Sequence, residues 1–364
     1  MRARRPDADA LGTSPPRRRD VLGYAWALGL GALTVPALAL STAGIVRAQD
    51  PSTAAGQRFM RIGTGSAAGH YFPIGGMIAN AISRPPGARP CEKGGSCGVP
   101  GLIAVAQSTG GSVDNIRGLA AGTLNLALCQ ADIAYWARSG SAVFEDVGPM
   151  PDLVALARLY DEKMHLVVRA NSDVTRVEDL RGRRVALGEL GSGTLVDARL
   201  VLAAHGLTED DVEPVYDRPG PAADQLVAGE IEAFFFVGAA PVTVVTELAE
   251  ALPIRLLDLN GETFAGMSGR HPYLSAGVIP GGVYAGVPEP VSTLAVAAVL
   301  VTTKTLDTET AHGITRAIWH PNVRGLFGSE DEPEMLTPAL APHGTGIPLH
   351  AGAQRYYEEA GYLP

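Results

Sequence analysis

The sequence has no internal repeat, no low-complexity segment and, after Val46, no apolar run long enough to span a bilayer. Its 44 glycines and 27 prolines occur singly and in short clusters, which indicates many tight turns. Hydrophobic residues make up 46% of the chain and charged residues 18%, a composition that excludes a disordered protein. A chain of 364 residues is long enough for two lobes and a sizeable core.

Positive charge is scarce outside the N-terminus. The whole chain carries a net charge of −9, and residues 1–48 contain seven arginines and three aspartates, so the remainder carries −13. This balance argues against nucleic acid and anionic lipid as partners. A small anion can still bind where backbone N–H groups line a cleft.

Residues 1–48 have the pattern of an export signal. A basic segment precedes an uncharged apolar stretch from Val21 to Val46, and small residues follow it. The stretch Arg18-Arg19-Asp20-Val21-Leu22 resembles the twin-arginine signal, which a receptor reads. We expect cleavage after Ala48 and a periplasmic protein; the alternative is an uncleaved membrane anchor.

The three cysteines suit an exported protein. Cys91 and Cys97 bound the short loop CEKGGSC, for which a local disulfide is the expected pairing. The alternative is a metal held by the pair, but no histidine or further cysteine is suitably placed, so no metal site is expected. Cys129 lies in the apolar run LALCQAD and is expected to be a buried thiol.

Strands and helices alternate along the rest of the chain. We expect strands at 58–65, 101–111 and 123–132, each followed by a helix, at 70–84, 112–122 and 133–140. The helix at 70–84 should begin near Pro73, and the helix at 112–122 should have Ser112 as its N-cap and end at Gly122. The pattern restarts at 179–207 and again at 231–252. Such alternation predicts mainly parallel sheets with helices on both faces.

Two long extended stretches, 153–170 and 292–306, interrupt this alternation. They predict two crossover strands that join two lobes. We expect lobe I at 49–165, lobe II at 166–295, and a return to lobe I at 296–364. Ligands of open α/β sheets bind beyond the carboxyl ends of the strands, so we expect a cleft between the lobes.

The glycine loop that starts at Gly63 is close to a dinucleotide fingerprint but does not match it. Its third glycine, Gly69, comes one residue late, and the next acid, Glu92, lies too far on to bind a ribose. No Gly-Lys-Ser/Thr follows, so it is not a phosphate-binding P-loop either. Free N–H groups and a helix N-terminus favour a carboxylate or another small anion; the alternative is a plain tight turn.

Other strand ends carry polar side chains. Ser112 follows one strand, and Gln130 and Asp132 follow the next, where Asp132 is alternatively a helix N-cap. Ser192 and Thr194 lie in a second glycine loop, GELGSGT, on the predicted second lobe. These loops are expected to face the same cleft.

Catalytic signatures are few. The stretch from Gly94 to Gly98 matches the hydrolase pattern G-x-S-x-G, but it lies in the predicted disulfide loop and lacks the flanking strand and helix. The eight histidines show no H-x-x-x-H spacing. His165, inside the first long stretch, is a candidate to face the cleft.

Several stretches that occur together and in order carry a family resemblance. They are HYFPIGG after the first glycine loop, TGGSVDN, QADIAYWA, DLRGRRVALGELGSGT, FFFVGAAP, IPGGVY and PLHAGAQRYYEEAGY. Over residues 58–362 the chain resembles the TAXI family of substrate-binding proteins, which serve TRAP-type secondary transporters. Where many members have two tyrosines before the proline, this chain has Tyr71 and Phe72.

The resemblance implies a two-lobe periplasmic binding protein with two crossover strands (type II-like). It also implies a small organic anion as ligand, a dicarboxylate or an amino acid such as glutamate, and a membrane partner of two integral subunits or one fused subunit. From the loops and the family pattern we expect these ligand-binding residues: Thr64, Gly65, Ser66, Ala67, Tyr71, Ser112, Gln130, Asp132, Ser192, Gly193, Thr194, Gly238 and Tyr284.

The expected function is therefore solute binding with domain closure, by a monomer without cofactor or catalytic activity. One alternative is a sensory ligand-binding module of the same fold. The other is a serine hydrolase that acts through Ser96.

Overall fold

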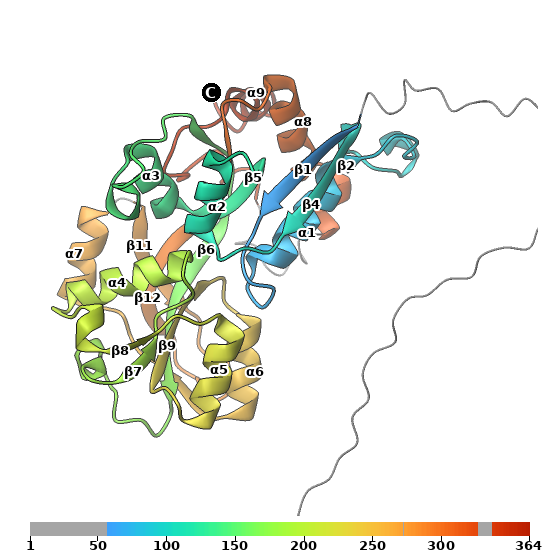
Figure 1. The fold of residues 1–364 in the computed structure, drawn as a ribbon. Coiled ribbons are helices and arrows are strands. Elements are labelled where there is room, and N and C mark those ends of the chain that lie inside the picture. Colours follow the sequence, from blue (N-terminus) through green and yellow to red (C-terminus); the bar gives the residue numbers. More distant parts are fainter. Residues whose placement is uncertain (1–56, 272, 327–336) are drawn as a thin grey trace, which may run out of the picture. The chain divides into compact units, whose positions relative to one another are not determined.

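A computed structural model describes residues 57–271, 273–326 and 337–364 (Figure 1). The predicted export signal and its cleavage point lie outside these residues. The described chain has an α/β fold: one curled sheet is flanked by helices, as the alternating pattern predicts. No helix in the described ranges is both long and apolar enough to cross a membrane.

The sheet has two parallel arms. The first arm contains β4 (Leu102–Gln107), β1 (Arg58–Gly63) and β5 (Leu126–Gln130), and the second contains β9 (Ala233–Gly238), β7 (Arg184–Ala186) and β8 (Glu213–Val215). Between them lie the antiparallel strands β12 (Val291–Thr303) and β6 (Leu153–Arg169). Shorter strands add to these two: β10 (Ile254–Leu256) pairs with β6, and β11 (Leu274–Ile279) pairs with β12.

The two long strands join the arms into one sheet. The pairing of β12 with β6 runs from Ala295–Lys163 to Thr303–Leu153. The latter half of β12 also pairs with β5 of the first arm, and the latter half of β6 pairs with β9 of the second. The prediction of two long strands is confirmed. Instead of a separate sheet in each lobe, however, one hydrogen-bonded ladder continues through both arms, because the long strands pair with each other.

Helices follow the strands of both arms. In the first arm they are α1 (Tyr71–Ile82), α2 (Ser112–Ala120) and α3 (Ala131–Ser139). In the second they are α4 (Gly193–Ala204), α5 (Pro219–Ala228), α6 (Thr243–Ala251) and α7 (Glu262–Arg270). The C-terminal helices α8 (Thr308–Ile318) and α9 (Ala351–Glu359) return to the first arm, where Tyr357 of α9 donates to the Leu156 carbonyl of β6.

Two helix starts differ from the prediction by one or two residues. α1 begins at Tyr71 rather than near Pro73, since proline is tolerated in the first turn, where N–H groups have no partner inside the helix. Gly111, not Ser112, is the N-cap of α2. Its φ of 117° turns the chain into the helix, a conformation that side chains disfavour.

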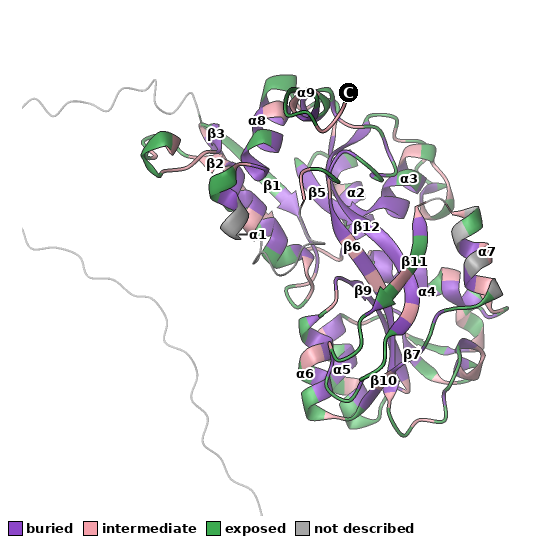
Figure 2. Ribbon diagram, turned by 180° about the vertical axis from the view of Figure 1, so that it is seen from behind, coloured by how far each residue is buried: buried purple, intermediate pink, exposed green. Residues whose placement is uncertain are grey.

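Apolar residues alternate between the two faces of the sheet. On β5, Leu126 and Leu128 pack toward α1 and α8, whereas Ala127 and Cys129 pack toward α2 and α3, as the two-residue period of a strand requires. One apolar cluster runs across both arms beneath α2, α3 and α4, and Figure 2 shows the buried strands at the centre. Cys129 is a free, buried thiol, as predicted.

A small insert follows α1. It contains β2 (Ser83–Arg84), the short 3-10 helix η2 (Cys91–Lys93) and β3 (Val99–Pro100), and β2 pairs with β3. A disulfide joins Cys91 to Cys97 within it. Another 3-10 segment, η6 (Pro321–Leu326), follows α8.

Candidate functional site

A cleft with an empty volume of about 620 Å³ lies between the two arms. Both arms supply lining residues, mostly from the loops between a strand and the helix after it. The first arm contributes Gly65, Ser66, Gly69, His70, Tyr71, Gly110, Gly111, Ser112 and Gln130, and β6 contributes Glu162. The second arm contributes Ala186, Gly188, Glu189, Ser192, Gly193, Thr194, Asp217, Pro219, Ala222, Phe235, Phe236 and Val237.

The first glycine loop is held by the neighbouring strand. Thr64 is fully buried, and its N–H and hydroxyl both donate to the Gln107 carbonyl, at 3.0 and 2.7 Å. The Gly69 N–H donates to the Ser66 carbonyl at 2.9 Å, which closes the turn before α1. This loop brings Gly65, Ser66 and the start of α1 to the cleft, where the positive end of the helix favours an anion.

The second glycine loop touches the first arm directly. The N–H groups of Val113 and Asp114, in the first turn of α2, donate to the Gly191 carbonyl at 3.0 and 3.1 Å. A Cβ on Gly193 would lie 1.3 Å from Gln130 Oε1, so any side chain there would require the buried Gln130 side chain to move. The arms are therefore in contact at one end of the cleft. The N-terminus of α2 also has less capacity for a ligand, because these N–H groups already have an acceptor.

Both hydroxyl groups at the start of α4 have a partner. Ser192 is the N-cap, and its Oγ accepts the Leu195 N–H at 3.1 Å. Thr194 Oγ1 accepts the Val237 N–H of β9 at 3.2 Å. Each hydroxyl keeps its own proton, so each can still donate to a ligand.

Glu162 is the acid at the base of the cleft. Its side chain is 3% exposed, and the Tyr71 hydroxyl donates to Oε2 at 2.6 Å. Burial, with the nearby charges of Asp132 and Asp161, raises the pKa of Glu162 to about 8, although the Tyr71 bond opposes this shift. At neutral pH the carboxyl group of the ligand-free protein is therefore largely protonated.

A second pair of buried acids links the arms behind the cleft. Asp132 of α3 is 0% exposed and Asp197 of α4 is 3% exposed. Gln130 Nε2 donates to Asp197 Oδ2 at 2.6 Å, and the Ile133 N–H donates to Asp132 Oδ1 at 2.8 Å. Asp132 Oδ2 and Asp197 Oδ1 have no N–H or hydroxyl partner in the described chain.

These two carboxyl groups lie close enough for each to affect the protonation of the other. Burial raises the pKa of Asp132 to about 6. Burial and the charge of Asp132 hold the pKa of Asp197 well above its usual range. Two buried carboxylates would repel each other, so a proton on at least one of these two acids is favoured.

The charge of the cleft is acidic. No lysine or arginine is among the described residues that line it, whereas Glu162, Glu189 and Asp217 are. Glu189 is paired with Arg218, whose Nε lies 3.0 Å from Oε2. Phe235 and Phe236 add apolar surface.

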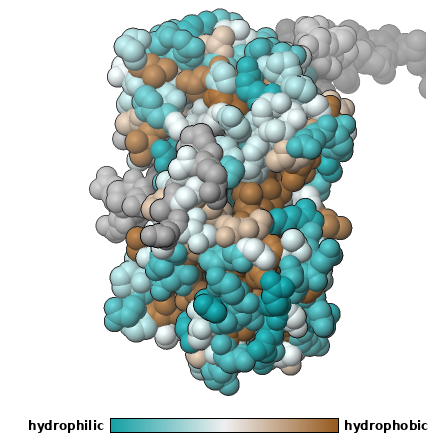
Figure 3. Space-filling model, turned by 90° about the vertical axis from the view of Figure 1, so that its left-hand side faces the viewer, coloured by the Kyte–Doolittle hydropathy of each residue, from teal (hydrophilic) through white to brown (hydrophobic). Residues whose placement is uncertain are grey.

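The space-filling view in Figure 3 shows one face of the molecule, which is largely hydrophilic with smaller groups of hydrophobic residues.

The structure gathers many of the predicted site residues around this cleft. Those that line it are Gly65, Ser66, Tyr71, Ser112, Gln130, Ser192, Gly193 and Thr194. Thr64 and Asp132 are buried behind the lining, Ala67 is exposed in the loop, and Gly238 ends β9 away from it. The role of each in ligand binding remains a prediction.

Tyr284 and His165 form a separate buried pair. The Tyr284 hydroxyl accepts the Val242 N–H at 2.9 Å and donates to His165 Nε2, also at 2.9 Å. His165 Nδ1 then donates to the Lys163 carbonyl. Burial lowers the pKa of His165 to about 4, so it is neutral. His165 is not among the residues that line the cleft, contrary to the sequence hypothesis, because its side chain is turned toward Tyr284.

Two alternatives from the sequence find no support at their residues. Ser96 lies outside the cleft, and its hydroxyl donates to the Ser83 carbonyl, which is a structural role. Asp132 is the second residue of α3 and not its N-cap, which is Gln130.

Sequence reasoning missed several lining residues. Glu162, Glu189, Asp217, Phe235 and Phe236 were not among the candidates, although Phe235 and Phe236 lie in the quoted stretch FFFVGAAP. The sequence feature that could have identified Glu162 as a site residue is its position as an acid within the long, mainly apolar strand β6.

Comparison with known proteins gives one family match. The model of the NMT1-like family matches residues 62–361.

Solved structures resemble the chain at low identity. The alkanesulfonate-binding protein SsuA from Xanthomonas axonopodis pv. citri, bound to MOPS, is 16% identical, with 84% of this chain and 80% of that chain covered and a TM-score of 0.42. The periplasmic aliphatic sulphonate binding protein SsuA from Escherichia coli is 15% identical, with 84% and 79% covered and a TM-score of 0.41. A putative L-cystine ABC transporter from Listeria monocytogenes is 12% identical, with 76% and 96% covered and a TM-score of 0.44. Such identities do not carry a ligand from one protein to another.

Proposed function

The chain belongs to the NMT1-like family, and we propose that it is a periplasmic solute-binding protein of a transport system. The observation that carries this proposal is the cleft, to which both arms contribute loops at the carboxyl ends of their strands. A ligand that contacts both arms stabilises the form in which they touch, so binding is coupled to closure. The export pattern at the N-terminus supports the periplasmic location.

The charges in the cleft favour an amino acid over a dicarboxylate. The described residues that line the cleft include Glu162 and Asp217, one histidine, His70, and no lysine or arginine, so a dianion would approach these acids without a lysine or arginine to offset their charge. An ammonium group has favourable charge for Glu162, while the first glycine loop and the start of α1 suit the carboxylate. Phe235 and Phe236 would pack against the carbon chain. The ligand we propose therefore carries one ammonium group and at least one carboxylate.

Two kinds of membrane partner fit a solute-binding protein. The ordered stretches that resemble the TAXI family favour a TRAP-type secondary transporter. The structurally similar protein from Listeria is described as a putative L-cystine ABC transporter, which makes an ATP-driven partner the alternative. Membrane subunits that co-purify with the exported protein distinguish the two, since only the second includes an ATPase.

Native mass spectrometry of freshly purified protein tests the ligand class directly. We expect a retained small molecule that contains an amine and a carboxylate, and we expect calorimetric titration of the emptied protein to show binding of the same compound. A retained dicarboxylate without an amine would leave solute binding in place but overturn the ligand class. Failure of any released or screened solute to bind would overturn the function itself.

A further inference from the structure

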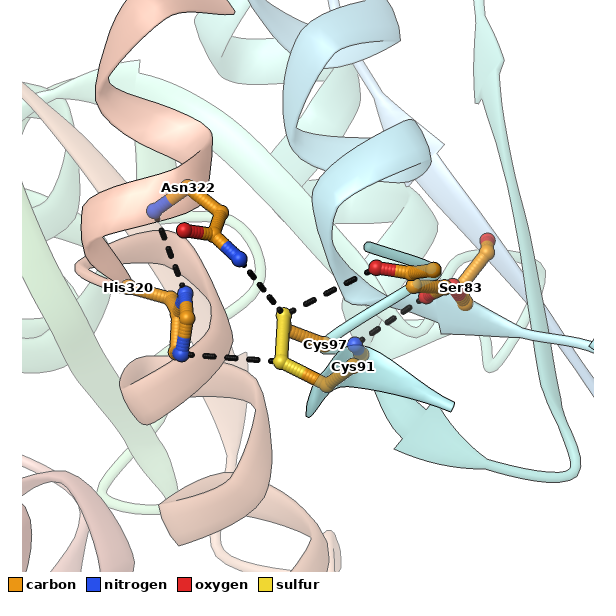
Figure 4. Close-up of a disulfide and its surroundings, with 8 residues drawn as sticks. Ser83, Cys91, Cys97, His320 and Asn322 are labelled. Atoms are coloured by element: carbon orange, nitrogen blue, oxygen red, sulfur yellow. Dashed lines mark hydrogen bonds between the residues drawn. A yellow bond between two sulfur atoms is a disulfide. The ribbon is translucent and has the colours of Figure 1, made fainter. Parts of the chain in front are cut away.

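The disulfide of the insert has hydrogen-bond donors at both of its sulfurs. His320 Nε2 lies 3.6 Å from Cys91 Sγ, and Asn322 Nδ2 lies 3.7 Å from Cys97 Sγ. His320 and Asn322 come from the segment that follows α8, Asn322 within η6, whereas the cysteines lie in the insert after α1 (Figure 4). The expectation that no histidine is suitably placed beside the cysteine pair was wrong, because the fold brings His320 to it from 229 residues away in the sequence.

A neighbouring bond indicates where the proton of the His320 ring lies. The Asn322 backbone N–H donates to His320 Nδ1 at 3.2 Å. A neutral imidazole carries one proton, so an accepting Nδ1 leaves the proton on Nε2, directed at Cys91 Sγ. The sulfur and nitrogen atoms of Cys91, Cys97 and His320 lie within 4.8 Å of one another, but an Nε2 that carries a proton is a donor and not a metal ligand.

We propose that the Cys91–Cys97 bond is a site of thiol–disulfide exchange with a dithiol reductant, in which Asn322 and His320 stabilise the two cysteine thiolates. A hydrogen bond to a thiolate is stronger than one to a neutral sulfur, because the acceptor is charged. Donors at both sulfurs therefore favour the reduced form more than the oxidised form. Cys91 is half-buried, so a reductant can reach it.

The exchange proceeds in two steps that balance. A thiolate of the reductant attacks Cys91 Sγ, the Cys91–Cys97 bond breaks, and its electron pair stays on Cys97 Sγ beside Asn322 Nδ2. In the mixed disulfide, Cys91 Sγ is bonded to the first sulfur of the reductant. The second thiol of the reductant, as its thiolate, then attacks that first sulfur, and Cys91 leaves as a thiolate beside His320 Nε2–H. The reductant is oxidised to its disulfide, the two cysteines gain two electrons, and the protons released by the reductant are available to them.

The insert has other bonds that keep it in place when the disulfide opens. The Ser96 hydroxyl donates to the Ser83 carbonyl, and the Gly98 N–H donates to Ser96 Oγ at 3.1 Å. The Gly101 N–H donates to the Arg84 carbonyl at 2.8 Å. A bond between residues six apart also constrains the unfolded chain only modestly. Both oxidation states are therefore compatible with the fold.

The test is a redox titration of the folded protein in mixtures of reduced and oxidised dithiothreitol. After each mixture reaches equilibrium, the protein is denatured and alkylated, and mass spectrometry counts one labelled cysteine in the oxidised form and three in the reduced form. For His320→Phe we expect an equilibrium constant for reduction about tenfold lower than that of the wild type, since a hydrogen bond to a charged group is lost. Tenfold corresponds to about 30 mV for this two-electron couple.

Three further variants make the result specific. His320→Gln keeps an N–H donor and should restore most of the difference, whereas Asn322→Leu should lower the constant in the same direction as His320→Phe. His343→Phe, at an exposed histidine outside the cluster, should behave like the wild type. Circular dichroism checks the fold of each variant.

Two outcomes would overturn the proposal. One is the same equilibrium constant for the wild type, His320→Phe and Asn322→Leu. The other is tight binding of Zn²⁺ by the reduced wild type that His320→Phe abolishes, because a metal needs the Nε2 lone pair and would make His320 a ligand instead of a donor.

Discussion

At the scale of single residues, the proposed ligand class depends most on Glu162. It is buried at the base, receives one hydrogen bond from Tyr71, and is protonated at neutral pH in the ligand-free protein. An ammonium group beside it would stabilise the carboxylate and lower its pKa. Ligand binding at pH 7 would then release a proton, which an exposed carboxylate, already ionised at this pH, would not do.

Glu162→Gln should remove this proton release and weaken binding. We expect at least a tenfold loss of affinity for the amino acid that the purified protein retains, because a buried charge pair is lost. Titration calorimetry in two buffers with different ionisation enthalpies measures the protons released. Asp161→Asn is the matched control, since Asp161 is the next residue on β6 and pairs with Arg158 instead. Equal proton release in Glu162→Gln and the wild type would show that Glu162 does not contact the ammonium group.

The same residue should make stability depend on pH. The raised pKa of Glu162, about 8 against a usual 4.5, means that the folded protein holds this proton more tightly than the unfolded chain does. The stabilisation is complete below about pH 4.5 and is lost as pH rises toward 8, with an upper size on the order of a few kcal/mol. Urea unfolding of the ligand-free protein at pH 5.5 and 8 should show the lower free energy of unfolding at pH 8. Glu162→Gln should reduce this difference much more than Asp161→Asn, which removes only a smaller contribution to the raised pKa of Glu162.

At the scale of elements, the loop before α4 is the point where the arms meet. The Gly191 carbonyl of this loop accepts two N–H groups of α2, and Gly193, the first residue of α4, lies against the Gln130 side chain. Ligand affinity should therefore depend on this loop even where it does not touch the ligand, because it determines how closely the arms approach.

Gly193→Ala should weaken binding without unfolding either arm. Its methyl group would overlap Gln130 Oε1, and overpacking of this kind costs about 1–3 kcal/mol. We expect the overlap to weaken the contact between the arms, so that the form that binds ligand is less stable and affinity falls about tenfold. Gly220→Ala in α5 is the control, because a Cβ there meets no atom within 4 Å. A loss in Gly220→Ala as large as that in Gly193→Ala would mean that the effect is not specific to the contact between the arms.

Much of the element order follows from local sequence, whereas the composition of the site depends on register. Gly63, Gly69 and Gly193 mark loops because their spacing is local and each precedes an apolar helix. Glu162 and Phe235 could not be placed that way, since the pairing of β6 with β9 and β12 determines which residues of a long strand face the cleft. His320 illustrates the same limit, because its neighbour Cys91 belongs to a distant segment.

At the scale of the whole molecule, two buried acids make the contact between the arms sensitive to pH. Asp132 belongs to the first arm and Asp197 to the second, and burial raises the pKa of both. Ionisation of both would leave two buried carboxylates close to each other in a region of low dielectric. The repulsion would be relieved most readily by separation of the arms, since each acid lies on a different one.

Raising the pH should therefore open the ligand-free protein, and Asp197→Asn should prevent this. Asparagine keeps the acceptor for Gln130 Nε2 and carries no charge, so it cannot repel an ionised Asp132 at high pH. Small-angle X-ray scattering at pH 5 and pH 9 should show a larger radius of gyration at pH 9 for the wild type and no change for Asp197→Asn. Asp161→Asn, whose acid lies outside this pair, should expand as the wild type does. If the wild type has the same radius at both pH values while circular dichroism shows it folded, the Asp132–Asp197 pair does not hold the arms together. The closed form would then rest on the backbone bonds between Gly191 and α2, which do not titrate.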